Sequence, residues 1–491
     1  MRKILSIILS AIMLLSACVF AIPASAAEGT AINTADEFLN MAATGTYYLN
    51  SDITLSGTYA NAFNGTFDGN GHTVTVSAPM FADFSGTVKN LTIKGAINFS
   101  DANAAAFAVL SSNGIHAENV VNKANVTVIG AGQYAAGFVC IDNAKQTNKE
   151  NADSTFVNCV NDGEIYIEST VAKNPTAAGF AAVIDSVSFT GCTNNAKVTS
   201  KGNLAIAAGL AANVIPVAGD NNCYAYNCVN NGDITSVEAY ADSTGAASTG
   251  ASETAGLFAN IGVKKNVGIY IVYGCVNNGN ITGWHCTGGI AGLLHINDQD
   301  FSGEQTAVVT NCTNNGSVNS LNSYAGGMVG RVYYALDAKF TGCINNGYIT
   351  GYSNIGGIIG HTTASSAIIT AWQNNGEIAT TTDEASSAYA GGIIGYAQGT
   401  NDPNHSADYG EMASRIQFCI NTGNVSSMRR TGGIVGSSGA DSAYGITYID
   451  YCINTGNVTN YGTVNGSHAQ GCAGGIQGYG YGSKSKPQYV I

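Results

Sequence analysis

Charged side chains are scarce in this sequence. They make up 10% of its 491 residues, and lysine and arginine together number only 19. Because phosphates require a basic surface, this composition excludes an ordinary nucleic-acid-binding protein. Proline is also rare, with 6 residues, so neither a collagen-like chain nor a proline-rich linker is expected. Beyond the first 26 residues, no apolar run is long enough to span a membrane.

The first residues have the pattern of a secretion signal. Arg2 and Lys3 precede an apolar stretch from Ile4 to Ala17, and small residues at 24–27 offer a cleavage site. We therefore predict a signal peptide over residues 1–26 and a mature chain of net charge −15 that is secreted or held at the cell surface. An alternative is that "LSAC", which ends at Cys18, is a lipobox and that Cys18 carries a lipid anchor.

The chain repeats one short pattern, of which "CINNGYITGYSNIGGIIGHTT", residues 343–363, is a clear copy. Its cysteine serves as the anchor for aligning the copies, and the shortest spacing between anchors is 29 residues. The equivalent anchors are Leu91, Val120, Cys159, Cys192, Cys228, Cys275, Cys312, Cys343, Trp372, Cys419 and Cys452. Self-similarity at this period predicts a solenoid.

Each copy contains three short apolar pieces separated by Gly and Asn. The first leads into the anchor, the second centres on a β-branched residue six positions later, and the third is a Gly-Gly-hydrophobic segment such as "GGIIG" at Gly356. All are too short for helices and rich in β-branched residues. The sequence therefore predicts an all-β parallel β-helix (β-solenoid) with three short strands per coil, whose stacked coils bury a continuous core.

Two polar rows accompany the anchors. Asparagine stands two residues after ten of the eleven anchors, and buried amides stacked between coils would form a hydrogen-bonded ladder. Glycine usually stands four residues after the anchor, where we expect a turn with positive φ. Ala124 and Ala196 interrupt this glycine row, so strain or a different turn is expected there.

The chain divides into four segments. After the signal peptide, residues 27–60 form an N-terminal cap with a short helix that begins at Thr34, in "TADEFLNMAA". Residues 61–480 form the β-helix, and residues 481–491 form a C-terminal tail. Because no second cap is visible, either the tail covers the last coil or another segment or a partner does.

"FNGTFDGNGHTVTV" and "TVKNLTIKG", within residues 63–95, resemble the opening of many bacterial right-handed β-helix proteins. The Gly-hydrophobic-hydrophobic-Gly cores resemble the GLUG motif of bacterial surface proteins and of the non-catalytic part of immunoglobulin-A proteases. The resemblance covers roughly residues 30–480 and implies a right-handed coil. The early cores ("AGFAAV", "AGLAAN") depart from the motif, and the protease's zinc-binding His-Glu-x-x-His is absent, so no proteolysis is implied.

The mature chain contains twelve cysteines, of which eight are anchors. In a secreted chain this count can indicate a disulfide framework. However, the same repeat position also accepts Leu91, Val120 and Trp372, which favours a buried row of thiols. Cys286 and Cys472 hold equivalent positions five coils apart, too far to bond. No CxxC spacing supports metal binding by the row.

Two groups of residues are candidates for binding. Outward threonines and their polar neighbours, namely Thr235, Thr282, Thr350, Tyr348 and Asp233, form a flat face suited to polysaccharide, although an ordinary solvated strand face has the same composition. In "HINDQDFSGE", Asp298, Asp300 and Glu304 form the densest acidic group and are the candidate ligands of a loose Ca²⁺ site; a solvated loop is the alternative. No other cofactor is expected.

These observations favour a secreted or surface-displayed, non-enzymatic adhesive or binding module. The expected partner is a polysaccharide or a surface glycoprotein, bound by many weak contacts along a rigid face. Two alternatives stay open: a carbohydrate-active β-helix lyase or hydrolase, which would need clustered carboxylates, and a passive spacer. His285, in "GWHC", is interpreted as structural.

Overall fold

The structure is a computed structural model of the chain. It describes residues 28–142, 153–169, 171, 173–214, 221–238, 252–262, 268–295, 306–333, 336–363, 366–381, 388–398, 413–439, 446–462, 471–480 and 489–490. The predicted signal peptide, Cys18, and the acidic group Asp298, Asp300 and Glu304 lie outside these residues. Within the described chain, no helix is long and apolar enough to cross a membrane.

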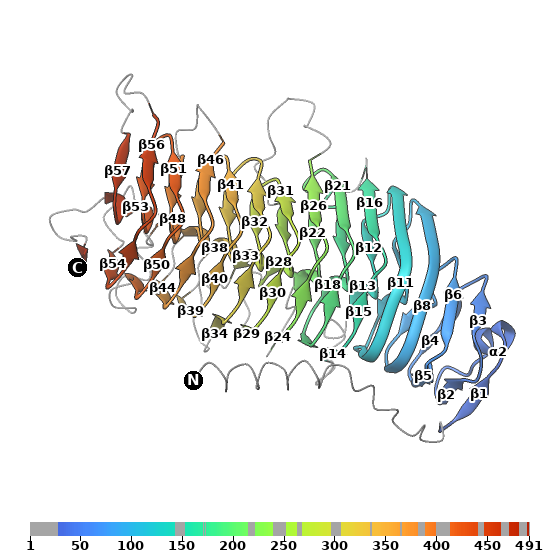
Figure 1. The fold of residues 1–491 in the computed structure, drawn as a ribbon. Helices are drawn as coiled ribbons and strands as arrows, with labels where there is room; N and C mark the ends of the chain where they lie inside the picture. The colour runs from blue at the N-terminus through green and yellow to red at the C-terminus, as the bar shows by residue number, and fades with distance from the viewer. Residues whose placement is uncertain are drawn as a thin grey trace, which may run out of the picture.

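The described chain is a parallel β-helix, as predicted. Its coils stack in sequence order from the N-terminal to the C-terminal end (Figure 1). The strands of successive coils pair in parallel and form three long sheets of 35, 13 and 11 described strands. The residues of one coil therefore recur in register in the next, and each repeat position becomes a row along the molecule.

One coil illustrates the pattern. The first piece of the repeat forms β39 (Leu336–Thr341), followed by the short β40 (Ile344–Asn345), and the β-branched piece forms β41 (Ile349–Gly351). All three belong to the largest sheet. The Gly-Gly piece is divided between β42 (Asn354–Gly356) and β43 (Ile359–Thr363), in the other two sheets. Each coil therefore contains five short strands where three were predicted, because turns within the coil interrupt the hydrogen-bonded pairing with the neighbouring coils.

The predicted N-terminal capping helix is present as α2 (Ala35–Leu39). Thr34 accepts a hydrogen bond from the Glu37 amide at 3.2 Å, and the Glu37 carboxylate accepts one from the Thr34 amide at 3.3 Å, which completes a capping box. Phe38 is fully buried and its ring contacts Tyr59 and Phe67. The helix therefore covers the first coils with an apolar side chain.

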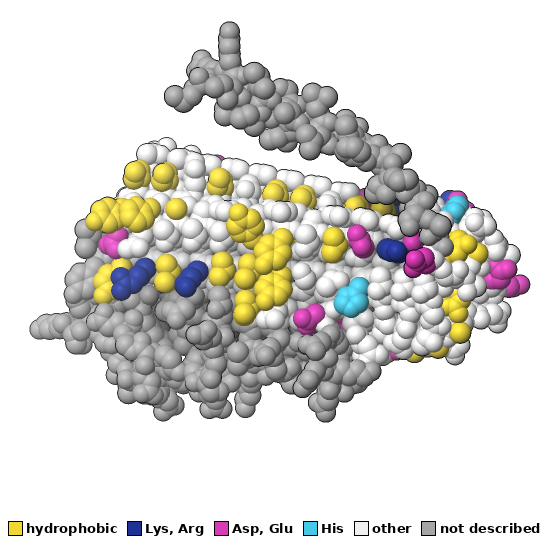
Figure 2. Space-filling model, turned by 90° about the horizontal axis from the view of Figure 1, so that it is seen from below, with side chains coloured by type: hydrophobic (Ala, Val, Ile, Leu, Met, Phe, Trp, Pro, Cys, Tyr) yellow, Lys and Arg dark blue, Asp and Glu magenta, His cyan; other side chains and the backbone are white. Residues whose placement is uncertain are grey.

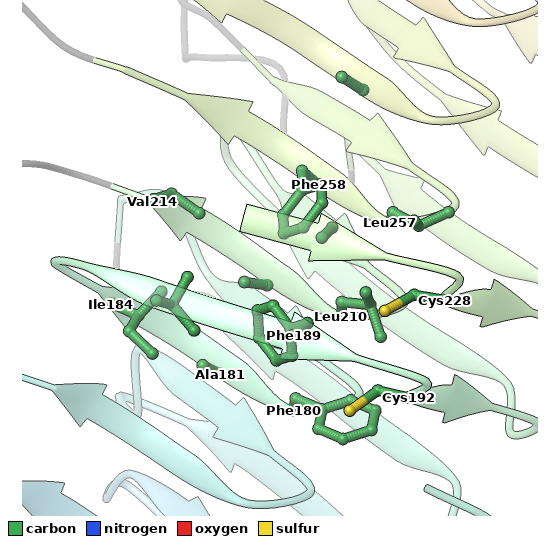
Figure 3. Packing of buried hydrophobic residues seen from close by; sticks show 14 of the residues in the cluster. Phe180, Ala181, Ile184, Phe189, Cys192, Leu210, Val214, Cys228, Leu257 and Phe258 are labelled. Atoms are coloured by element: carbon green, nitrogen blue, oxygen red, sulfur yellow. The ribbon is translucent and has the colours of Figure 1, made fainter. Parts of the chain in front are cut away.

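The core consists of rows of identical or similar side chains. The anchors and the β-branched residues six positions later are buried in nearly every coil, and Cys452 and Val458 of the last coil are half-buried. Figure 3 shows anchors Cys192 and Cys228 packed among Phe180, Phe189 and Leu210. On the surface seen from below, side chains of the hydrophobic class, which includes tyrosine, also fall in rows along the long axis, and Lys or Arg side chains stand between some of them in the lower row (Figure 2).

The asparagine ladder is confirmed. Each Nδ2 amide donates to the Oδ1 atom of the asparagine in the next coil, over nine bonds of 2.7–2.8 Å. The same amide also donates to a carbonyl two residues later in its own coil, for example from Asn314 to Gly316 at 2.8 Å. Nine of the ten ladder asparagines are fully buried, so the ladder satisfies amides that would otherwise be costly to bury.

A second ladder, which the sequence analysis did not identify, runs along the surface one residue further on. Exposed amides from Asn195 to Asn375 donate to the preceding coil at 2.8 Å, opposite in direction to the buried ladder. The Asn-Asn pair of the repeat thus supplies one buried and one exposed ladder.

The explanation expected for the glycine four residues after the anchor holds at Gly95, where φ is 134°, and is wrong for the later coils. From Gly163 to Gly456, the glycines of this row are not among the residues with positive φ. They are required because the turns of adjacent coils nearly touch: a Cβ at Gly347 would lie 1.9 Å from the Gly316 carbonyl oxygen. Ala124 and Ala196 keep the same turn, since their carbonyls accept from the ladder amides at 3.2 and 2.9 Å. The expected break is therefore absent.

The left-handed turn lies elsewhere, at the residue just before each anchor. All eleven residues at this position have φ between 52° and 67°. Most are Asn or Gly, which tolerate this conformation. The exceptions are Ala371, Phe418 and Tyr451, near the C-terminal end.

Replacing Ala371 with glycine is expected to stabilise the protein. Ala371 holds φ at 58°, which costs an alanine about 1 kcal/mol relative to glycine. We expect a higher urea midpoint for Ala371→Gly than for the wild type. The control is Gly342→Ala, the reverse change in the preceding coil at φ 67°, which should lower the midpoint. An unchanged or lowered midpoint for Ala371→Gly would contradict this account.

The cysteines match the prediction of a buried thiol row. All twelve beyond residue 27 are free, and only Cys452 and Cys472 are half-buried. Anchor Sγ atoms contact the carbonyl two residues earlier, for example Cys312 to Thr310 at 3.4 Å. Burial raises the pKa of the Cys192 thiol well above its usual range, which disfavours the reactive thiolate. Cys286 and Cys472 lie on strands five steps apart in one sheet, as expected.

Candidate functional site

The predicted binding face consists of the outward side chains of the second strand in each coil, at five, seven and nine residues after the anchor. We call it the second-strand face. In the coil of β41 it presents Tyr348, Thr350 and Tyr352, with the two tyrosines 46% and 39% exposed. In the preceding coil it presents Ser317, Asn319 and Leu321. Thr350 donates to Asn319 at 2.8 Å, so the polar side chains are linked between coils.

The structure brings the five predicted face residues onto this one surface. β26 (Ile234–Val237), β31 (Ile281–Gly283), β36 (Val318–Ser320) and β41 pair successively, and Thr235 lies directly beside Thr282. The three threonines are half-buried, whereas Tyr348 and Asp233 are exposed. The Asp233 carboxylate accepts from the Asn280 amide at 2.8 Å, which gives it a structural role between coils.

A second surface was not predicted. At each Gly-Gly turn the chain reverses between two sheets, and the residue two before the first glycine faces the residue five after it. From β37 (Tyr324–Gly326) to β58 (Gln477–Gly480), all of these positions except Ser437 and Cys472 carry large polar or aromatic side chains. We call this row the corner strip; it comprises Tyr324, Arg331, Asn354, His361, Tyr389, Tyr396, Arg430 and Tyr479.

Cations stacked on tyrosine rings characterise the corner strip. The Arg331 guanidinium lies 5.0 Å from the ring centre of Tyr324 and 4.4 Å from that of Tyr333. The Arg430 guanidinium lies 4.6 Å from Tyr389 and 3.9 Å from Tyr479. Such contacts hold a guanidinium flat and leave its edges free to donate hydrogen bonds.

His361 continues the stack between the two arginines. Its ring packs parallel to Tyr396, 5.0 Å away, and 4.9 Å from Tyr324. Burial and the charge of Arg331 lower the pKa of His361 to about 3, and burial lowers the pKa of His285 to about 4. Both imidazoles are therefore neutral at physiological pH, and the positive charge of the strip comes from its arginines.

The floor of this corner changes along the molecule. In the early coils, the space between the two strands of the corner is filled by two small hydrophobic clusters outside the main core. They consist largely of alanines such as Ala178, Ala208 and Ala182. From Gly288 onward, glycine replaces alanine. A Cβ at Gly326 would lie 2.0 Å from the Val329 carbonyl oxygen, so the two strands approach more closely in the later coils. The departures from the GLUG-like pattern thus mark a different packing of the corner.

A buried carboxyl lies in the same row, before the corner strip. Glu253, in β27 (Glu253–Ala255), pairs with Cys286 in β32 (Cys286–Gly288). Burial raises the pKa of Glu253 to about 7, although the charge of Arg331 lowers it. Its Oε1 atom has no hydrogen-bond partner. His285 contacts the Cys286 sulfur at 3.1 Å, but burial raises the Cys286 pKa far above its usual range, so the pair is neutral.

Within the described chain, no group of three His, Cys, Asp or Glu side chains could hold a metal ion. The predicted Ca²⁺ ligands Asp298, Asp300 and Glu304 lie outside that part of the chain, so this site stays a prediction.

Sequence reasoning missed the corner strip because the residue types at its two positions vary from coil to coil. The available signal was positional. Every arginine after Arg2 lies between residues 331 and 430, within the coils where the Gly-Gly motif is complete.

Comparisons with known proteins add little to this geometry. No family model matches the chain, and no curated protein does. A crystal structure of a candidate immunoglobulin A1 protease from Bacteroides ovatus is similar over 88% of this chain and 85% of that one, with 12% sequence identity and a TM-score of 0.29.

Proposed function

We propose that the protein is a secreted or cell-surface, non-enzymatic β-helix repeat protein of the GLUG-like kind that binds glycans or surface glycoproteins through its second-strand face. The observation that carries this proposal is the exposure of Tyr348 and Tyr352 on either side of Thr350 in one coil. Tyrosine rings pack against the apolar faces of sugars, and their hydroxyl groups stay available for hydrogen bonds.

The rest of the face supports the same reading. Leu321 and Tyr461 are also exposed, and the outward side chains between them are mostly amides and hydroxyls. The Tyr461 hydroxyl bonds to Thr380, two coils away, at 2.8 Å, which fixes this ring along the edge of the face. Because the same positions recur every coil, a long polymer would make many weak contacts that together give avidity.

The proposal is tested by sedimenting the mature chain with insoluble xylan, cellulose and mucin. We expect at least one of them to bind, and the Tyr348→Ser, Tyr352→Ser double variant to bind about tenfold more weakly, since two stacking contacts are lost. The matched control is Tyr273→Ser, which removes a tyrosine of similar exposure, 43%, from the first strand of its coil. Equal loss in the control, or no binding to any polysaccharide, would overturn the proposal.

A further inference from the structure

The arginines of the corner strip are charged, and although the charge of Arg331 lowers the pKa of the buried Glu253 carboxyl, that carboxyl forms no salt bridge with it. In the part of the chain that the structure describes, neither Arg331 nor Arg430 forms a salt bridge with a carboxylate. Arg331 donates to the Thr363 hydroxyl at 3.0 and 3.3 Å, and Arg430 donates to the Ser437 hydroxyl at 2.9 Å. A guanidinium has five N–H donors, so most of this capacity is unused.

Several buried polar atoms between the two arginines are also unsatisfied. They are Asn354 Oδ1 and His361 Nδ1, whose residues are only 5% exposed; Nε of Arg430 itself is also without a partner. His361 Nε2 donates to Gln398 Oε1 at 3.1 Å, which leaves Nδ1 of the neutral ring as an acceptor. Buried polar atoms in folded proteins normally have partners. The described chain therefore leaves these polar atoms without a partner, next to guanidinium groups that form no salt bridge.

We propose that the corner strip binds acidic glycans, with Arg331 and Arg430 each pairing with a carboxylate of one uronic-acid polymer. Arg331 and Arg430 are three coils apart, which corresponds to roughly 14 Å along the molecule. A planar guanidinium matches a carboxylate with two parallel hydrogen bonds.

The local contacts, and not the net charge, favour a glycan. The chain beyond residue 26 carries a net charge of −15, which opposes any polyanion, so binding depends on the two guanidiniums and on the aromatic rings beside them. The tyrosine rings of the strip offer apolar faces to sugars as well as supporting the cations. This site is separate from the second-strand face and does not depend on it.

The test is affinity electrophoresis of the full chain in gels that contain polygalacturonate, with fully methyl-esterified polygalacturonate as the uncharged control polymer. We expect the wild type to be retarded only by the charged polymer, and less so at high salt. Arg331→Gln and Arg430→Gln should each weaken binding about tenfold. Arg430→Lys keeps the positive charge but cannot form two parallel hydrogen bonds with a carboxylate. It should therefore bind polygalacturonate more tightly than Arg430→Gln and more weakly than the wild type.

The matched control is Arg415→Gln. Arg415 also stacks on a tyrosine, Tyr448, at 4.7 Å, but it lies exposed on the largest sheet, away from the strip. Its loss should leave polygalacturonate binding unchanged. Equal weakening by Arg415→Gln, no weakening by the strip variants when circular dichroism shows them folded, or equally tight binding of single-stranded DNA would overturn the inference. Unaltered sedimentation of the strip variants with neutral polysaccharides would separate this site from the second-strand face.

Discussion

Replacing Asn314 with alanine is expected to destabilise the protein by on the order of 4 kcal/mol. The Asn314 amide donates to Asn345 and to the Gly316 carbonyl, and its oxygen accepts from Asn277 at 2.7 Å. Alanine would leave two or three buried polar groups without a partner, each of which costs about 1–3 kcal/mol. The change therefore interrupts the ladder in the middle of the molecule.

The adjacent residue provides the control. Asn315 belongs to the exposed ladder and makes the same kind of contact, to Asn278 at 2.8 Å, but water replaces its partners when it is removed. Asn315→Ala should cost less than about 0.5 kcal/mol. Urea denaturation of both variants, together with hydrogen exchange of the neighbouring coils, measures the difference. Similar losses for the two variants would contradict the assignment of the buried ladder as the structural one.

Glu253→Gln is expected to stabilise the protein at pH 8 and to have little effect at pH 4. The folded-state pKa of Glu253, about 7, lies above the ordinary value of 4.5. Between these pH values the folded chain retains a proton that the unfolded chain has released. The contribution of protonated Glu253 to the free energy of unfolding is therefore fully present below pH 4.5. It is lost as the pH rises through 7, which lowers the free energy of unfolding of the wild type by about 3 kcal/mol in total.

Glutamine keeps the shape of the protonated carboxyl and cannot ionise, so the variant should not show this loss. Melting temperatures of wild type and variant, compared from pH 4 to 8, give the test. The buried histidines His285 and His361 titrate at lower pH in both proteins and cancel in the difference. A melting-temperature difference that does not grow with pH would mean that Glu253 is not buried as the structure has it.

The sequence predicted the repeating framework well because stacking acts on every coil in the same way. The anchors, the β-branched row and the buried asparagines must each fit a neighbour of the same kind, so their residue types recur and can be aligned. The helix at Thr34 was predictable for a local reason, its capping box. In contrast, the sequence analysis explained the glycine at position 347 by a turn with positive φ, whereas close contact with the neighbouring coil is what requires it.

The binding surfaces were predicted only in part. Tyr348 and the threonines were placed on one face because strand alternation determines which side chains point outward. The corner strip depends on two strands that meet across a Gly-Gly turn, and nothing in the periodicity shows that residues seven apart, such as Tyr324 and Arg331, face each other. The left-handed row before the anchors was missed because Ala371 and Tyr451 obscure its Asn and Gly preference.

Incubation of the mature chain with plant, microbial and mucin polysaccharides tests the central claim most directly. The mixtures are sedimented, and the supernatants are assayed for new reducing or unsaturated ends. The account predicts that the protein sediments with at least one polysaccharide and that no new ends form. New ends would make the protein a carbohydrate-active enzyme, and absence of both binding and cleavage would leave it a passive spacer; either result would contradict the account.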